Sequence, residues 1–436
     1  MKIFFITRIA ALLIFIHSFV QAQQSPAQLT SEKLNEYFSA LTSLNRFNGN
    51  VLVAHAGTSI FDRTYNMPAA PEEMKVTRDN RFIIASVSKV FVKYGILKLV
   101  EQKKISLEDK LSKFFPDFPN GNRITVNHLL HHQSGLPREV KDYEKYKKIS
   151  GKQLIAMAKK EKLLFEPGTQ TLYSNIGFLL LHAIIDISSD NGYLRYIQDQ
   201  IFTPMSLHAT TEYNDKEKYQ NFARGFTLDD GNIKRAPFVV IDRFETGNYV
   251  STIQDLFTFA EKGFTGKYLP ENLVRELFDE NEILAQAGGR PGYRAYFYKN
   301  KNTSYDFMMV SNYSDIPIQS IIDDVVNIME GKPYEIPKKI ERKAVNLSLE
   351  KLKRFEGKYV LEADNQQQYI LILKNEKLIL KDKEGETTEL FPDSETSFFY
   401  DPASKDGLEF KWDSKSGKYE LYIISTGISL KAKRIE

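Results

Sequence analysis

The stretch that decides the fold is Ile84-Ala85-Ser86-Val87-Ser88-Lys89. Apolar residues follow it at positions 90, 91, 94, 97 and 100, a spacing typical of an amphipathic helix that begins near Ser86. On such a helix Ser86 and Lys89 share one face. A serine hydroxyl becomes a nucleophile when a neighbouring base takes its proton, and a buried, neutral lysine can be that base. The helix N-terminus adds a favourable field of about 0.3–1 kcal/mol for developing negative charge.

Ser-x-x-Lys is a weak signal by itself, because the same spacing recurs at Ser348-Leu349-Glu350-Lys351. That copy lies in a charged segment, where we interpret Ser348 as a helix N-cap and Lys351 as a solvated side chain. The Ser86 copy therefore needs support from other segments before it predicts a catalytic site.

Two further segments could complete a site around Ser86. Tyr173-Ser174-Asn175 offers a tyrosine that can relay protons and an amide that can bind a substrate carbonyl or amide. The alternative is a half-buried tyrosine beside a helix-capping asparagine. Gln286-Ala287-Gly288-Gly289-Arg290 precedes a predicted strand, and its glycines would let a substrate lie against the backbone. If this strand flanks Ser86, the N–H groups of Ser86 and Gly289 could form an oxyanion hole; the alternative is an ordinary hairpin turn.

In their order along the chain, these segments resemble the serine β-lactamase and penicillin-binding protein superfamily. The resemblance runs from about Phe47 to Asn312 and is closest to the branch with class C β-lactamases, D-alanyl-D-alanine carboxypeptidases, D-aminopeptidases and family VIII esterases. The motifs that carry it are Ser86-Val87-Ser88-Lys89, Ile124-Thr125-Val126-Asn127-His128-Leu129-Leu130-His131-His132-Gln133-Ser134-Gly135-Leu136-Pro137, Phe165-Glu166-Pro167-Gly168, Tyr173-Ser174-Asn175 and Gly288-Gly289-Arg290-Pro291-Gly292-Tyr293.

The resemblance implies a role for each site residue. Ser86 would be the nucleophile, Lys89 the general base, and Tyr173 the group that helps to activate the serine and protonates the leaving group. Asn175 would hold the substrate amide or ester, and Thr252 would cap a helix. Substrate contacts are expected at Gln286, Gly288, Gly289 and Arg290.

The strand beside the site departs from the family pattern. Many members carry Lys-Thr-Gly or His-x-Gly, whereas this chain has Gln286-Ala287-Gly288. A neutral glutamine attracts a substrate carboxylate less than a lysine does, because a charge-assisted hydrogen bond is roughly twice as strong as a neutral one. The departure favours esters or amides that carry less charge than β-lactams, unless Arg290 supplies the missing cation.

The rest of the chain predicts an α/β (α+β) fold in two domains. Residues 1–22 have basic residues, an apolar run and a small residue at the end, as in a cleavable signal peptide. In residues 23–335, strand-like runs at both ends and helices between them predict an antiparallel sheet flanked by helices, which joins the ends of the domain. A linker is expected at 336–345, within a segment rich in proline and lysine, and the alternating runs of 346–436 predict a small antiparallel β barrel or sandwich.

Composition restricts the partners. The 59 basic and 56 acidic side chains nearly balance, which gives no support for a nucleic-acid partner, and the absence of cysteine excludes a thiol nucleophile and a disulfide framework. Removal of the signal would leave no integral membrane segment. A zinc site at His128, His131 and His132 is the metal alternative, but these residues lack a His-Glu-x-x-His arrangement. We therefore expect neither metal nor cofactor.

The sequence thus predicts an exported bacterial serine hydrolase, periplasmic or secreted, that forms an acyl-enzyme on Ser86. Its expected substrates are small esters or amides and peptides that contain D-amino acids. A β-lactamase or D-alanyl-D-alanine carboxypeptidase is the enzymatic alternative. A protein of the same fold that binds an acyl group or a peptide without turnover is the alternative from another class.

Overall fold

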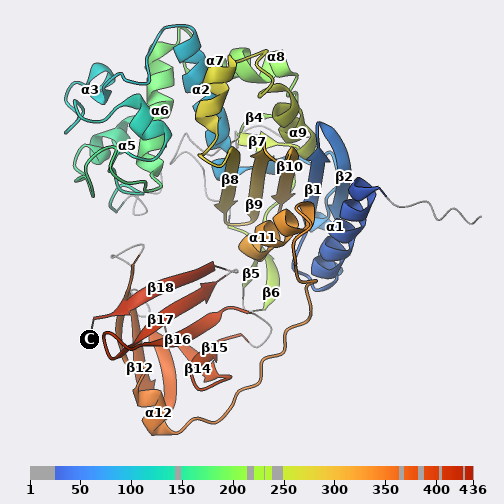
Figure 1. The fold of residues 1–436 in the computed structure, drawn as a ribbon, viewed down its shortest axis with the longest axis vertical. Coiled ribbons are helices and arrows are strands. Elements are labelled where there is room, and N and C mark those ends of the chain that lie inside the picture. Colours follow the sequence, from blue (N-terminus) through green and yellow to red (C-terminus); the bar gives the residue numbers. More distant parts are fainter. Residues whose placement is uncertain are drawn as a thin grey trace, which may run out of the picture.

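The computed structural model describes residues 25–142, 149–213, 220–229, 231–237, 249–362, 368–381, 387–401, 405–425 and 428–435. The predicted signal peptide, residues 1–22, lies outside these ranges. Within them no helix has the length and apolar character needed to cross a membrane. Figure 1 shows a mixed domain of helices and sheet, followed by a β barrel.

A five-stranded antiparallel sheet forms the centre of the N-terminal domain, the part of the chain from Pro26 to Met329. Its order is β2-β1-β10-β9-β8, and β1 pairs with β10 in a register that sets Gly49 opposite Ser311. The sheet therefore joins strands from the two ends of the domain, as the sequence predicts. The five strands are β1 (Gly49–His55), β2 (Thr58–Tyr65), β8 (Ile283–Arg290), β9 (Tyr293–Asn300) and β10 (Tyr305–Ser311).

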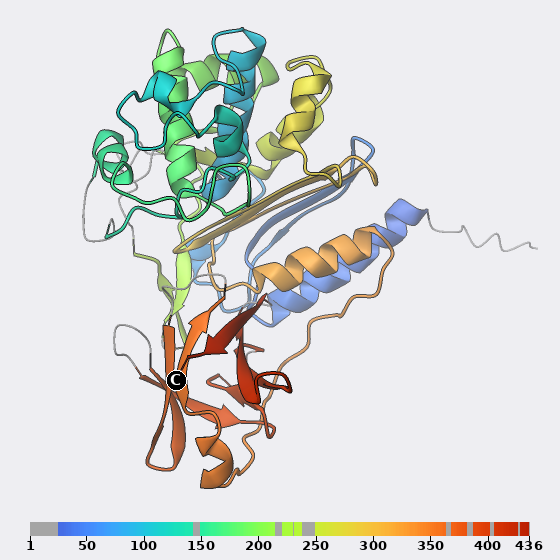
Figure 2. The ribbon, with the colours of Figure 1, turned by 60° about the vertical axis from the view of Figure 1, so that its left-hand side comes forward.

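Strand β1 is buried on both of its faces, which explains its continuous apolar run. Val51 and Val53 point into the core under α1 (Pro26–Ser43) and α11 (Ile318–Met329), and Figure 2 shows these two helices side by side on one face of the sheet. Leu52 and Ala54, on the opposite face, join the larger core beneath the other helices. A strand buried on both sides reads as continuously apolar because successive side chains alternate between two cores.

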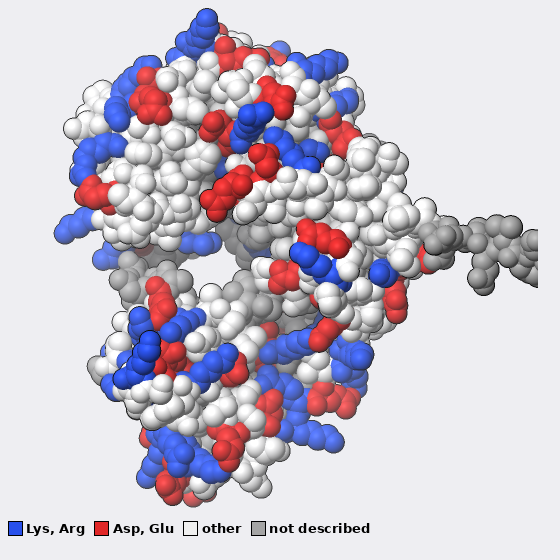
Figure 3. Space-filling model, viewed as in Figure 1, with Lys and Arg blue, Asp and Glu red and all other residues white. Residues whose placement is uncertain are grey.

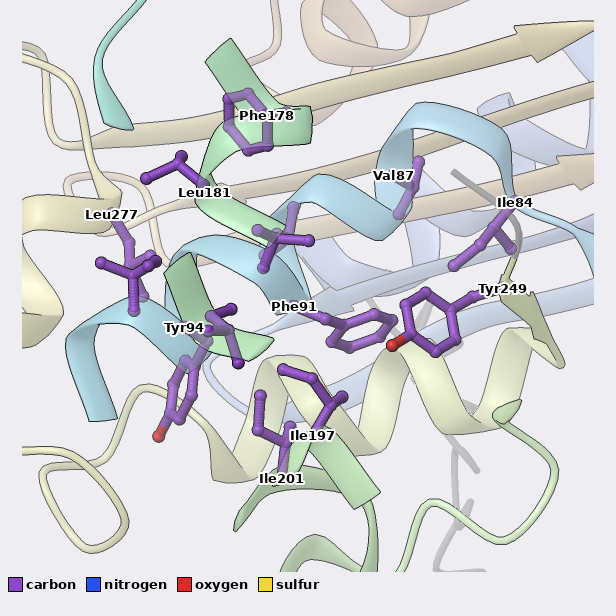
Figure 4. Close-up of a cluster of buried hydrophobic side chains, with 14 of the residues drawn as sticks. Ile84, Val87, Phe91, Tyr94, Phe178, Leu181, Ile197, Ile201, Tyr249 and Leu277 are labelled. Carbon is purple, nitrogen blue, oxygen red and sulfur yellow. The ribbon is translucent and has the colours of Figure 1, made fainter. Parts of the chain in front are cut away.

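The larger core surrounds two helices, α2 (Lys89–Glu101) and α6 (Asn175–Ser188), which pack against each other. In Figure 4, Phe91 and Tyr94 of α2 lie among Tyr249, Ile197 and Ile201. Burying each such side chain stabilises the fold by about 1.5–3 kcal/mol. This packing holds the first turn of α2 in place.

The remaining elements of the N-terminal domain are short. As predicted, Thr252 caps α9, because its side chain accepts a hydrogen bond from Asp255 N. In chain order the elements are η1 (Glu72–Met74), β3 (Phe82–Ile83), the 3-10 helix η2 (Ala85–Ser88), α3 (Leu111–Phe114), α4 (Val126–Leu130), α5 (Gly151–Ala158), α7 (Tyr193–Ile197), η4 (Gln198–Phe202), α8 (Thr203–Met205), β4 (Thr211–Glu212), β5 (Phe226–Asp229), β6 (Asn232–Arg235), β7 (Tyr249–Ser251), α9 (Ile253–Lys262), α10 (Glu271–Val274) and η5 (Arg275–Leu277).

The C-terminal strands close into an eight-stranded antiparallel barrel with its own core, so the barrel prediction is confirmed. It begins after α12 (Leu349–Lys353), which Ser348 caps by accepting from Lys351 N at 3.4 Å. The second Ser-x-x-Lys is therefore the helix cap that its surroundings predict. The barrel strands are β11 (Gly357–Leu361), β12 (Gln368–Lys374), β13 (Lys377–Lys381), β14 (Thr387–Pro392), β15 (Ser397–Phe399), β16 (Gly407–Asp413), β17 (Lys418–Ser425) and β18 (Ile428–Arg434).

Surface charge follows the composition. On the face seen in Figure 3, basic and acidic side chains are interspersed over both domains. On this face no broad field of one sign is present, so electrostatic selection of a ligand there depends on individual residues.

Candidate active site

Ser86 lies on a tight turn between β3 and α2. The expected helix near Ser86 starts as the 3-10 helix η2, and α-helical geometry begins only at Lys89. Ala85 has a φ of 45°, in the left-handed region that alanine rarely adopts, and Ile84 N donates to Tyr249 O at 3.0 Å. The surrounding core thus holds a strained backbone that leaves Ser86 partly exposed beside the buried Lys89.

Lys89 directs its amine at the serine. Lys89 Nζ lies 3.1 Å from Ser86 Oγ, and the lysine side chain is only 2% exposed. The same nitrogen lies 5.3 Å from the ring centre of Tyr173 and 5.5 Å from that of Phe178. Among the described residues no carboxylate forms an ion pair with Lys89. The amine is thus within hydrogen-bonding distance of the serine hydroxyl, the contact that proton transfer between the two groups requires.

Tyr173 is held against the site by His132, whose ring stacks on the tyrosine ring with centroids 4.5 Å apart. His132 Nδ1 accepts a hydrogen bond from Ser174 N at 3.1 Å, which requires that nitrogen to be unprotonated. Burial lowers the pKa of His132 to about 3, with smaller contributions from Lys93, Lys89 and His131. The histidine therefore stays neutral at physiological pH and keeps the segment that carries Tyr173 in place.

Asn175 is fixed by the loop that follows α4. Its backbone N donates to Arg138 O at 2.9 Å, and its side-chain amide donates to Glu139 Oε1. Arg138 also places its guanidinium carbon 5.2 Å from the ring centre of Tyr173. Arg138 and Glu139 were not singled out from the sequence, although they directly follow the motif that ends at Pro137.

Strand β8 passes directly beside the serine turn. A Cβ added to Gly288 would lie 2.3 Å from Ile84 O and 3.1 Å from Ser86 N, so only a glycine permits this approach. The structure thus brings Gly288 next to Ser86, as the predicted oxyanion hole requires. The role of Gly289 N–H in that hole stays a prediction.

The other two residues expected on this strand face different surroundings. Gln286 turns its amide back to donate to Ala287 O at 2.8 Å. Arg290 lies at the end of β8, where burial lowers its pKa and the neighbouring Tyr293 and Tyr213 partly offset that effect. Arg290 follows Gly288 by two residues, so it lies at the end of β8 that passes Ser86, but its guanidinium is buried near these tyrosines.

The three histidines considered as metal ligands have separate contacts. His128 Nδ1 accepts from Thr125 N at 3.4 Å in a capping box, and His131 Nε2 lies 3.5 Å from Glu276 Oε2. His132 supports Tyr173. Nowhere in the described ranges do three or more His, Cys, Asp or Glu residues gather in a way that could hold a metal ion.

The chain matches known proteins over most of its length. The family model described as Beta-lactamase matches residues 34–314. Penicillin-binding protein 4* of Bacillus subtilis is 27% identical over 416 residues, which cover 84% of this chain and 90% of that protein. The teichoic acid D-alanine hydrolase of Staphylococcus aureus strain MRSA252 is 22% identical over 66% of this chain and 76% of its own length.

A solved structure shows the same fold. The D-amino acid amidase of Ochrobactrum anthropi SV3, complexed with D-phenylalanine, aligns with a TM-score of 0.60 and 21% identity over 69% of this chain and 99% of the amidase. Since the family model matches more than half of the chain, the protein belongs to the Beta-lactamase family and is a serine hydrolase of the β-lactamase and penicillin-binding protein fold.

Proposed function

We propose that this protein is an exported hydrolase that forms an acyl-enzyme on Ser86 and cleaves esters or amides of D-amino acids. The observation that carries the proposal is the 3.1 Å contact between Ser86 Oγ and the buried Lys89 Nζ. The signal-like residues 1–22 support export to the periplasm or the cell exterior. The names of two similar proteins, a teichoic acid D-alanine hydrolase and a D-amino acid amidase, support the substrate class.

The reaction follows from the positions of the polar atoms. Lys89 Nζ takes the proton of Ser86 Oγ, and the oxygen attacks the substrate carbonyl carbon. The carbonyl oxygen becomes negative in the tetrahedral intermediate, where the backbone N–H groups of Ser86 and Gly289 stabilise it. Tyr173 gives its proton to the leaving alcohol or amine as the bond to carbon breaks, and it regains a proton from Lys89, which returns to the neutral amine. Water then attacks the acyl-enzyme by the same steps in reverse and frees Ser86.

In this reaction Asn175 binds the substrate. Its amide is oriented by Glu139, and it lies two residues after Tyr173 at the start of α6. An amide held in this way presents its remaining donor and acceptor to a substrate carbonyl or amide group.

The test is a trapped covalent adduct. A penicillin should acylate the peptide that contains Ser86, and a fluorophosphonate should phosphonylate it with loss of fluoride. Ser86→Ala should abolish this labelling and lower turnover at least about a thousandfold. Ser348→Ala removes the serine of the second Ser-x-x-Lys and should label like the wild type. Labelling of Ser86→Ala at the original rate would remove Ser86 from the mechanism.

Three substrates separate the remaining activities. A nitrophenyl ester of D-alanine, nitrocefin and a D-alanyl-D-alanine peptide report esterase, β-lactamase and carboxypeptidase activity. Rapid hydrolysis of nitrocefin alone would favour a β-lactamase. An adduct that forms on Ser86 but never turns over with any of the three would favour a binding protein.

A further inference from the structure

Arg138 is a solvent-facing cation at the proposed proton donor. Its guanidinium carbon lies 5.2 Å from the ring centre of Tyr173, and its side chain is 68% exposed. Arg138 O accepts from Asn175 N at 2.9 Å, so the backbone of the arginine is tied to the first turn of α6. The position of this cation is thus coupled to two residues of the proposed site.

The carboxylate of Glu139 is next to Arg138 in the chain but does not form a hydrogen bond with the guanidinium. Arg138 Nε lies 4.0 Å from Glu139 Oε1, beyond hydrogen-bonding distance, and Glu139 is only 27% exposed. Glu139 Oε1 instead accepts from the amide of Asn175. Within the described part of the chain the Arg138 side chain makes no hydrogen bond, so its donors remain available to a ligand.

The other candidates for a substrate-binding cation have different places. Gln286 is neutral where many family members have a lysine, and the side chain of Arg290, two residues after Gly288, is buried near Tyr213 and Tyr293. Lys89 is buried beside Ser86. Among the described residues, Arg138 is therefore the exposed cation that adjoins Tyr173.

We infer that Arg138 binds a negative charge on the leaving group, and that the substrates are acyl donors whose leaving group carries a carboxylate or a phosphate near the scissile bond. The inference rests on the proposed function, in which Tyr173 protonates the leaving group and so must lie next to it. A guanidinium presents paired N–H donors that match the oxygens of a carboxylate or a phosphate. Arg138 thus supplies, from the loop after α4, the cation that is absent at the position of Gln286.

The experiment compares substrates that differ only in this charge. One pair is D-alanyl-D-alanine and its C-terminal amide, and the other is the D-alanyl ester of glycerol phosphate and that of glycerol. In the wild type, the charged member of at least one pair should have a kcat/KM about tenfold higher than its neutral partner. A preference in the first pair identifies a carboxylate, and one in the second pair a phosphate.

Variants assign the preference to Arg138. Arg138→Gln should bring the ratio within a pair to about one, because the charged member loses about tenfold more kcat/KM than the neutral member, and Arg138→Lys should retain part of the preference. Arg195→Gln is the matched control, because Arg195 is 67% exposed on α7 and its loss changes net charge equally. This control should leave the ratio unchanged.

Three results would overturn the inference. They are equal wild-type rates within both pairs, an equal loss for charged and neutral members in Arg138→Gln, and no hydrolysis of either pair by an enzyme that still labels at Ser86. Failure of the wild type to label at Ser86 is a different result, because it would refute the proposed function itself.

Discussion

Replacing Gly288 with alanine should separate β8 from the serine turn. The added Cβ would lie 2.3 Å from Ile84 O, whereas ordinary contact begins at 3.4 Å, so the two backbones must move apart by about 1 Å. A side-chain rotation cannot relieve this contact, because the new Cβ and the carbonyl oxygen are both fixed to the backbone. A displacement of about 1 Å at a reacting centre costs about a hundredfold in rate.

The assay is kcat/KM for a nitrophenyl ester of D-alanine, together with the rate of fluorophosphonate labelling at Ser86. Gly288→Ala should lower both about a hundredfold and destabilise the fold by about 1–3 kcal/mol, the usual range for overpacking. Gly177→Ala is the control, because its Cβ would meet only side-chain atoms at 3.7 Å in the first turn of α6. Activity of Gly288→Ala within threefold of wild type would refute the close approach of β8 to Ser86.

Two further predictions concern stability. The pKa of His132 is about 3 in the fold and near 6.5 in the unfolded chain, so the unfolded state binds the extra proton and stability falls as pH drops from above 6.5 toward 3. Urea unfolding at pH 7.5 and 5.0 should show the wild type losing about 1–2 kcal/mol more than His132→Asn, and equal losses would contradict this. Arg342 donates to Asp393 at 2.6 Å and to Asp406 O at 2.9 Å, so Arg342→Leu should destabilise the barrel by about 2–4 kcal/mol. Lys343→Leu is its control, because Lys343 is exposed. Equal melting temperatures of the two variants would show that the contacts of Arg342 with Asp393 and Asp406 do not stabilise the barrel.

The fold was predictable where the pattern of apolar residues is compatible with only one arrangement of buried faces. The run Val51-Leu52-Val53-Ala54 requires a core on each side, and the structure supplies both. The alternating runs after Asn346 predict antiparallel strands with a buried and an exposed face, which the barrel confirms. The start of α2 was not predictable in detail. The 3-10 turn at Ser86 depends on the hydrogen bond from Ile84 to Tyr249, a contact between distant segments.

The site was predictable in its parts but not in its surroundings. The chemistry of a serine near a lysine, and the order of the motifs, pointed to Ser86, Lys89 and Tyr173, which the structure brings together. Arg138 gave no such signal, because its place over Tyr173 depends on the path of the loop after α4. Gln286 shows a similar limit, since the direction of a flexible side chain follows from local hydrogen bonds that no spacing reveals.

The pairing of β1 with β10 affects the folding of the chain during synthesis. Ser311 Oγ donates to Asn48 O, 263 residues back along the chain, so one edge of β1 lacks its neighbour until nearly the whole N-terminal domain has been synthesised. An unpaired strand edge invites aggregation, and such distant pairing slows folding. A nascent chain that ends before Ser311 therefore exposes this edge and depends on chaperones or on delayed collapse, whereas the barrel closes from consecutive hairpins once its last strand emerges.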